Sequence, residues 1–242
     1  LSYAYVIEKT DDLTQLSGFQ EGAFVIQDIS SMLAVEALGL PKMDNQGTLK
    51  ILDICAAPGG KSMLAADILN HADIDYMLEA RDISEYKVEL MQENFNRCHL
   101  NKAKAVAWDA LEPDERWLGQ ADVVIADIPC SGLGVIGRKR DIKYKMTPQA
   151  VQDIVELQEK ILKVAASYVK KGGKLLFSTC TVNKDENEAH VKWIQDTLKM
   201  TPVSLNGTLP GLVHSPTTQQ GFVQLIPGMQ DTDGFFISVF EK

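Results

Sequence analysis

From Leu49 onward, short apolar segments alternate with longer segments whose apolar residues recur at helical spacing. Strands are expected at 49–54, 76–80, 104–107, 123–128 and 174–179. Helices are expected between them, at 61–70, at 84–98 and from Pro148 to the glycine pair 172–173. Parallel strands need long crossover connections, usually helices, so this alternation predicts an α/β fold with a mostly parallel sheet covered on both faces.

The segments on either side of this alternation are less regular. Before it, Asp28 is expected to cap a lead-in helix that starts at Ile29. After it, Asn183 and Glu186 have the spacing of a capping box, which predicts a helix through residue 199. Residues 201–220, rich in Pro, Gly, Ser and Thr, are expected to form a loop, and strands are expected at 223–226 and 235–240.

Composition limits the classes of protein to which the chain can belong. Hydrophobic residues make up 45%, which is typical of a globular protein, and the net charge of −9 disfavours indiscriminate binding to nucleic acid. No apolar segment approaches the roughly 18 residues of a membrane span, and no signal peptide opens the chain, so a cytoplasmic protein is expected. The four cysteines are too widely spaced for a C-x-x-C metal pair, so free thiols and no metal are expected.

The turn after the first expected strand is dense in small residues and reads Asp-Ile-Cys-Ala-Ala-Pro-Gly-Gly-Lys over 53–61. In doubly wound sheets this turn often contacts a ligand through its backbone. A Walker phosphate loop requires glycine where this chain has Cys55, and a G-x-G-x-x-G fingerprint is absent. A smaller ligand of nucleoside type therefore remains.

Acidic residues end four successive expected strands, at Asp53, Asp82, Asp109 and Asp127. Asp82 has the spacing from the glycines of a residue that binds a ribose, and Asp109 could accept a hydrogen bond from an adenine amino group. The alternative is that these acids only cap turns or helices. Four of them beside a small-residue turn favour S-adenosylmethionine as the ligand.

Cys130 and Cys180 lie just beyond the fourth and fifth expected strands. Both strand ends flank the expected ligand cleft, so the two thiols are expected to converge on one pocket. A stabilised cysteine thiolate is a strong nucleophile, although a single cysteine at a strand end is more often a small buried apolar residue. For Cys55 and Cys98, the role of a small buried apolar residue is favoured over that of a nucleophile.

Six motifs occur in order between residues 19 and 242. They are Gln-Asp-Ile-Ser-Ser at 27–31, the turn at 53–61, Asp-Ile-Pro-Cys-Ser-Gly at 127–132, Arg-Lys-Arg-Asp-Ile-Lys-Tyr at 138–144, Ser-Thr-Cys-Thr at 178–181 and Asp-Gly-Phe-Phe at 233–236. Together they resemble the RNA cytosine-5 methyltransferases of the RsmB/Sun type, in particular the bacterial enzymes that modify 16S ribosomal RNA. The resemblance implies a class I S-adenosylmethionine-dependent methyltransferase (Rossmann-like) fold with an antiparallel strand near the C-terminus. It also implies that 19–242 are the catalytic domain and that 1–18 are the remnant of an N-terminal RNA-binding extension.

The resemblance assigns a role to three residues in methyl transfer to carbon 5 of cytosine. The Cys180 thiolate would attack carbon 6 of the ring, which makes carbon 5 nucleophilic. Asp127 would hold or protonate ring nitrogen 3 as charge develops there. Cys130 would then assist removal of the carbon 5 proton and release of the enzyme.

The resemblance also implies two sets of binding residues. S-adenosylmethionine would contact Cys55, Ala56, Ala57, Pro58, Gly59, Gly60, Lys61, Asp82, Asp109 and Asp127. Ribosomal RNA, the expected partner of a monomeric enzyme, would contact the basic residues Arg138, Lys139, Arg140, Lys143 and Lys145. On an acidic protein this concentration favours phosphate contacts, and the alternative is a solvated charged loop.

The chain departs from the family pattern at two positions, and its motifs leave two other functions open. Arg140 stands where proline is expected, and Gly228 stands where histidine is often expected. A DNA cytosine-5 methyltransferase would use Cys130, the cysteine after proline, as the nucleophile. A module that binds S-adenosylmethionine and RNA without catalysis would form no covalent adduct.

Overall fold

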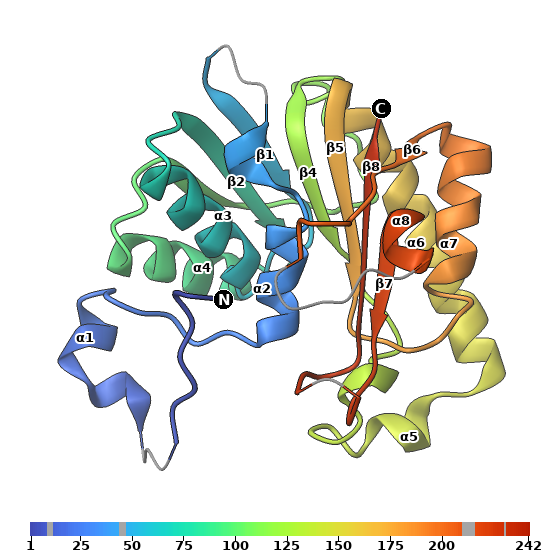
Figure 1. The fold of residues 1–242 in the computed structure, drawn as a ribbon, viewed down its shortest axis with the longest axis horizontal. Helices are drawn as coiled ribbons and strands as arrows, with labels where there is room; N and C mark the ends of the chain where they lie inside the picture. Colours follow the sequence, from blue (N-terminus) through green and yellow to red (C-terminus); the bar gives the residue numbers. More distant parts are fainter. Residues whose placement is uncertain (9–11, 44–46, 210–215, 230) are drawn as a thin grey trace.

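A single mixed sheet forms the centre of the protein, with strand order β3-β2-β1-β4-β5-β8-β6, and β7 also pairs with β8 (Figure 1). The computed structural model describes residues 1–8, 12–43, 47–209, 216–229 and 231–242, apart from the side chains of residues 143 and 145. The first five strands are parallel to one another, and β8 is antiparallel to β5. The predicted α/β fold with an antiparallel strand near the C-terminus is therefore confirmed.

The strands are β1 (Leu49–Asp53), β2 (Tyr76–Asp82), β3 (Ala103–Ala107), β4 (Ala121–Asp127), β5 (Val169–Thr179), β6 (Thr201–Pro202), β7 (Phe222–Leu225) and β8 (Phe235–Glu241). The helices are α1 (Ser17–Gln20), α2 (Ile29–Glu36), α3 (Gly60–His71), α4 (Glu85–Arg97), α5 (Ile142–Lys145), α6 (Pro148–Tyr168), α7 (Glu188–Trp193) and α8 (Pro216–Gln219). Short 3-10 turns lie at Leu13–Gln15, Leu40–Lys42 and Leu133–Val135, and a π-helical turn, Ile194–Leu198, continues α7.

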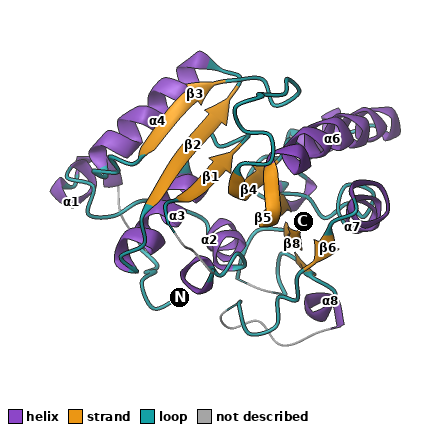
Figure 2. Cartoon of the chain, turned by 90° about the horizontal axis from the view of Figure 1, so that it is seen from above, coloured by secondary structure: helices purple, strands orange, loops and turns teal. Residues whose placement is uncertain are grey.

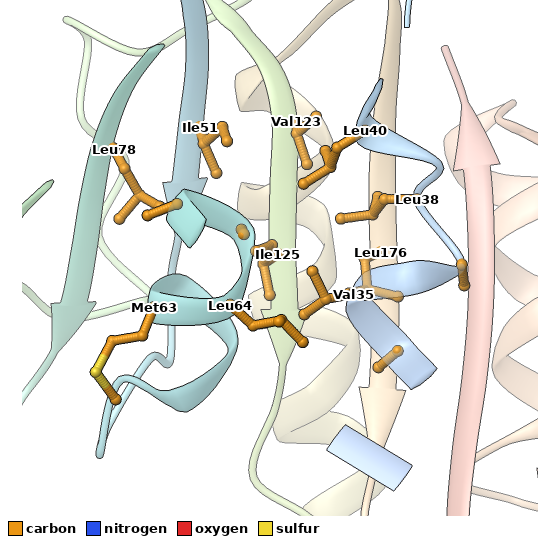
Figure 3. Close-up of a cluster of buried hydrophobic side chains, with 14 of the residues drawn as sticks. Val35, Leu38, Leu40, Ile51, Met63, Leu64, Leu78, Val123, Ile125 and Leu176 are labelled. Atoms are coloured by element: carbon orange, nitrogen blue, oxygen red, sulfur yellow. The ribbon is translucent and has the colours of Figure 1, made fainter. Parts of the chain in front are cut away.

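Helices cover both faces of the sheet, as Figure 2 shows for α2, α3 and α4 on one side and α6 and α7 on the other. Successive residues of a strand point to opposite faces, so Ile51 and Leu52 of β1 belong to different buried clusters. Figure 3 shows the cluster beneath α2 and α3, where Leu64 and Val35 lie near Ile125 and Leu176 of the central strands. Because both faces of the sheet are buried, the positions of its strand ends are fixed, and the candidate site lies at those ends.

Several predicted boundaries need correction. Helix α6 ends at Tyr168 rather than at the glycine pair, because the chain enters β5 at Val169 and Gly172, with φ +74°, lies inside that strand. Residues 201–220 are not all loop, since β6 pairs with β8 and α8 follows at 216–219; residues 210–215 lie outside the described residues. The boundary predicted between residues 18 and 19 stays a prediction.

The capping box predicted at Asn183 is also wrong, whereas the cap at Asp28 is confirmed. Asp28 Oδ1 accepts a hydrogen bond from the Ser30 backbone N–H at 3.0 Å. Helix α7 begins only at Glu188, and the fully buried Glu186 side chain accepts from the Ser131 backbone N–H instead of returning to Asn183. A long-range contact has replaced the local one that the spacing suggests.

A buried charge cluster lies on β2, at the face of the sheet that carries α6. The Arg81 guanidinium donates to Glu79 at 2.7 Å and to Asp114 at 2.5 Å, and all three side chains are buried. The ring of Trp108 lies 4.9 Å from the guanidinium carbon. A buried ion cluster of this kind is costly to disrupt, because removal of one partner leaves the others charged and desolvated.

We expect Arg81→Met to lower the free energy of unfolding by about 3–5 kcal/mol, measured by urea denaturation. Arg116→Met is the matched control, since Arg116 contacts the same Asp114 but its side chain is 64% exposed. The control should cost less than about 1 kcal/mol. Equal losses of unfolding free energy in the two variants would show that the buried Arg81 contributes no more to stability than the exposed Arg116.

Candidate active site

A cleft with a cavity volume of about 200 Å³ lies at the carboxyl ends of β1 and β4. It is lined by the small-residue turn, by the chain before α2 and the start of that helix, and by the end of β4. The predicted cofactor residues in its lining are Cys55, Ala56, Ala57, Pro58, Gly60, Lys61 and Asp127, together with Asp53. A cavity of this size holds part of a small-molecule ligand.

The turn between β1 and α3 approaches the lead-in chain closely. Gly59, with φ +95°, adopts a left-handed conformation that favours glycine and starts α3. A Cβ on Gly60 would lie 3.3 Å from the Gln27 side-chain nitrogen, so the absence of a side chain there lets Gln27 pack against the turn.

Unpartnered polar atoms in this lining fit a polar ligand such as S-adenosylmethionine. Among the described residues, both amide atoms of Gln27 and the Oδ1 of Asp53 are buried without a hydrogen-bond partner. Ser62 Oγ donates to the other Asp53 oxygen at 2.7 Å, while burial raises the pKa of Asp53 to about 7. Buried polar groups normally have partners, so these atoms are suited to hydrogen-bond a ligand in the cleft.

Three predicted cofactor residues, Gly59, Asp82 and Asp109, do not line this cleft. Asp82 ends β2 and accepts from the Ser84 backbone N–H at 3.0 Å. Asp109 follows β3 and accepts from the Leu111 backbone N–H at 2.9 Å. Each carboxylate therefore caps a local turn, which is the alternative role considered for these acids. Both residues nevertheless lie at the same edge of the sheet as the cleft.

The structure brings the two candidate thiols into contact. Cys130 Sγ and Cys180 Sγ lie 3.4 Å apart, because each cysteine follows one of the adjacent parallel strands β4 and β5. The hydrogen bond between the two sulfurs lowers the pKa of Cys180, and the same bond together with burial raises the pKa of Cys130. This polarisation favours Cys180 as the thiolate and Cys130 as its thiol donor.

Asp127 is held at the end of β4 by two hydrogen bonds. Lys61 Nζ donates to its Oδ2 at 2.6 Å, and Ser178 Oγ on β5 donates to its Oδ1 at 2.7 Å. The Lys61 ammonium also lies 5.1 Å from the ring centroid of Phe235. The carboxylate is thereby oriented beside the cleft, with its charge balanced by a buried lysine.

Gly134 joins the loop after Cys130 to two other motifs. Its N–H donates to the Cys180 carbonyl at 3.0 Å, and its own carbonyl accepts from the Gly234 N–H at 2.9 Å. A Cβ on Gly134 would lie 2.0 Å from the Gly234 carbonyl oxygen, so only glycine allows this approach. The Asp-Gly-Phe-Phe motif thus packs directly behind the cysteine loops.

The basic segment after Cys130 is only partly free for RNA. Arg138 pairs with Asp28 at 2.8 Å and with Asp233 at 3.2 Å, whereas Lys139 and Arg140 are exposed. The side chains of Lys143 and Lys145 lie outside the described residues.

Gly228, where histidine is often expected, has φ +83°, which favours glycine over any larger residue. Nothing in the structure explains arginine rather than proline at residue 140.

Sequence reasoning left the roles of Gln27 and Glu186 unrecognised. Gln27 belongs to the motif at 27–31, but the pattern there indicated only the start of a helix. Hydrophobic periodicity cannot predict its contact with the turn at 53–61, which is more than 30 residues away for Gly60. Glu186 matched the capping-box spacing, and no local signal reports its contact with Ser131.

Within the described ranges, no helix is both long and apolar enough to cross a membrane. In the same part of the chain, no group of three or more His, Cys, Asp or Glu side chains is arranged to hold a metal ion.

Comparisons with known proteins identify the family of this chain. The family described as 16S rRNA methyltransferase RsmB/F matches residues 40–241. The chain is 39% identical over 227 residues to a probable ribosomal RNA small subunit methyltransferase B of Bacillus subtilis, covering 93% of this chain and 49% of that protein. It therefore spans about half the length of the curated relatives it matches.

Solved structures give the same result for the fold. The structure of NSun6 from Pyrococcus horikoshii with SFG superposes with a TM-score of 0.78 at 27% identity, covering 96% of this chain and 56% of that one. A putative class I S-adenosylmethionine-dependent methyltransferase from Listeria monocytogenes shares the fold alone, at 15% identity and a TM-score of 0.57, over 88% of this chain and 59% of that one. With its cysteine pair and its cleft, the chain belongs to the RsmB/F family of 16S rRNA methyltransferases and has the class I methyltransferase fold.

Proposed function

We propose that this chain transfers a methyl group from S-adenosylmethionine to carbon 5 of a cytosine in 16S ribosomal RNA. The observation that carries the proposal is the 3.4 Å contact between Cys130 Sγ and Cys180 Sγ, next to a cleft lined by Lys61 and Asp127. Family membership supports RNA over DNA as the substrate. Such a substrate would place the enzyme in the cytoplasm, and its monomeric state stays a prediction.

Cys180 would begin the reaction by covalent addition. Its thiolate forms a bond to carbon 6 of cytosine, and the ring electrons displaced by that addition make carbon 5 nucleophilic. Asp127, oriented by Lys61 and Ser178, would hold the ring at nitrogen 3 as charge develops. S-adenosylmethionine, when bound in the cleft, supplies the methyl group.

Cys130 would act in the release step. Removal of the carbon 5 proton returns its electron pair to the ring, and the bond between carbon 6 and the Cys180 sulfur breaks in the same β-elimination. Cys130, as a thiolate at this stage, accepts the carbon 5 proton, and the thiol so formed hydrogen-bonds to Cys180 as it leaves as a thiolate.

The cofactor would be held by the turn 55–61, by Asp127 and by Asp82 and Asp109 farther along the edge of the sheet. Gln27 joins this set, because its unpartnered amide lies against Gly60 in the lining of the cleft. RNA phosphates would contact the exposed Lys139 and Arg140 with Arg138, Lys143 and Lys145, and the target base would leave its stack to reach the cleft. Residues 19–242 would form the catalytic domain, and 1–18 would belong to an RNA-binding extension.

S-adenosylhomocysteine at about 100 times its dissociation constant is expected to stabilise the protein by about 2.7 kcal/mol, a rise in melting temperature of roughly 5–10 °C. Asp82→Ala should reduce that rise if Asp82 binds the ligand. Asp75→Ala is the matched control. Asp75 directly precedes the first residue of β2, whereas Asp82 is its last, and the Asp75 side chain is 56% exposed. A thermal scan in which the unmodified protein shows no shift would contradict the cofactor assignment.

The function itself is tested by incubating unmodified 16S ribosomal RNA with this chain and S-adenosylmethionine, and then mapping 5-methylcytosine. We expect a new modified cytosine in the RNA. Methylation of DNA but not RNA would favour the DNA enzyme with Cys130 as its nucleophile. Cofactor binding without methylation of either would favour the non-catalytic module.

A further inference from the structure

A buried clamp holds the peptide groups on both sides of Cys130. The Glu186 Oε2 accepts from the Ser131 backbone N–H at 2.8 Å, directly after the cysteine. Gln158 Nε2 on α6 donates to the Pro129 carbonyl, directly before it, at 2.9 Å, and also to Glu186 Oε2 at 3.2 Å. Glu186 and Gln158 are both fully buried.

The same clamp reaches the second cysteine loop. Ser131 Oγ and Thr181 Oγ1 lie 2.8 Å apart, which joins the residues that follow Cys130 and Cys180. Because the two sulfurs touch at 3.4 Å, a small displacement of the 129–131 backbone would separate them. The clamp therefore controls the geometry on which the release step depends.

The clamp is costly to keep, which argues that it serves the site. Within the described part of the chain, Glu186 Oε1 and Gln158 Oε1 are buried without a hydrogen-bond partner. A buried carboxyl with an unused oxygen destabilises a fold, and natural proteins keep such groups mainly where a site needs them.

We propose that Glu186 is a positioning residue that holds the Cys130 thiol against Cys180 and places a negative charge behind its loop. The inference rests on the proposed function where it links Cys130 to the release step. Gln158 completes the clamp by tying the carboxylate to the Pro129 carbonyl.

The charged groups around the thiol support this division of labour. Cys180 faces Cys130 from the end of β5, Glu186 faces it from the turn before α7, and Lys61 and Asp127 lie on the Cys180 side of the pair. Glu186 adds to the rise in the pKa of Cys130, whereas Lys61 helps to lower the pKa of Cys180. Cys180 thus faces both Asp127, which raises its pKa, and Lys61, which lowers it, whereas the charge on Glu186 raises the pKa of Cys130.

The pH dependence of cysteine alkylation tests the clamp without RNA. Iodoacetamide is applied to the protein between pH 6 and 10, and the rate at Cys130 is followed by peptide mass spectrometry. Glu186→Gln keeps an acceptor for Ser131 but removes the charge, so Cys130 should react about tenfold faster near neutral pH, the change that one pKa unit gives. Glu188→Gln, at an exposed position two residues along, should react like the unmodified protein.

A second measurement links the clamp to RNA release. Glu186→Ala, which removes the acceptor, should accumulate covalent RNA adduct on denaturing gels, and Glu186→Gln should release most of it. The ligand-induced rise in melting temperature reports whether each variant is folded. Superimposable alkylation profiles for Glu186→Gln and the unmodified protein would overturn the inference, whereas a shifted profile with no adduct in any variant, Cys130→Ala included, would support the thiol assignment and contradict the proposed function.

Discussion

Cys180→Ala is expected to abolish methylation, with a loss of at least about a thousandfold in turnover, since the variant has no sulfur to add to carbon 6. The fold should persist, because alanine fits the space and the Cys180 backbone carbonyl still accepts from Gly134. Transfer of a labelled methyl group to RNA measures the effect. Over the pH range in which the thiolate forms, activity of the unmodified protein should rise with pH, and the lowered pKa of Cys180 moves that rise below the range of an ordinary cysteine.

Cys98→Ala is the matched control for this substitution. Cys98 packs against the buried cluster under α3 and α4, 4.0 Å from the sulfur of Met63 and away from the cleft lining. The Cys98→Ala variant should retain most of the activity of the unmodified protein. Full turnover by Cys180→Ala would overturn its assignment as the nucleophile.

Cys130→Ala is expected to have the opposite signature, a protein that remains covalently attached to its RNA. Addition through Cys180 and methyl transfer can proceed without the second thiol, although more slowly because the hydrogen bond that lowers the pKa of Cys180 is lost, whereas elimination requires it. A denaturing gel with labelled RNA should show a shifted band that persists after boiling in detergent. Its amount should approach one RNA per protein.

The double variant with both cysteines replaced by alanine is the control for that band. It should give no shifted species, because the bond to carbon 6 requires Cys180. A stable adduct formed by Cys180→Ala but not by Cys130→Ala would instead assign the nucleophile to the cysteine after proline, as in the DNA enzymes.

The sequence predicted the fold well where the hydrophobic pattern is repetitive. Buried parallel strands are short apolar runs, and the crossover helices between them carry a helical period, so β1 to β5 and α3, α4 and α6 were all expected near their observed positions. It failed where a tertiary contact replaced a local one. β6 inside the predicted loop exists because it pairs with β8, and no property of residues 201–202 reports that partner.

The candidate site was predictable in part for a similar reason. Cys130 and Cys180 end neighbouring strands, and parallel topology then brings them to one edge of the sheet, which a reading of strand order can anticipate. Gln27 and Glu186 act across long sequence distances through buried side chains. Their contacts depend on how loops pack after the sheet has formed, and neither spacing nor hydrophobic period encodes that packing.

The most direct test is to offer the unmodified protein an RNA in which 5-fluorocytosine replaces cytosine, together with S-adenosylmethionine. Fluorine at carbon 5 leaves no proton to remove, so the covalent complex should persist at the stage after methyl transfer. Mass spectrometry of the protease-digested complex then identifies the attached residue. We expect one nucleotide on Cys180, with a methyl group added at carbon 5; a nucleotide on Cys130, or no adduct at all, would contradict the assignment of Cys180 as the nucleophile.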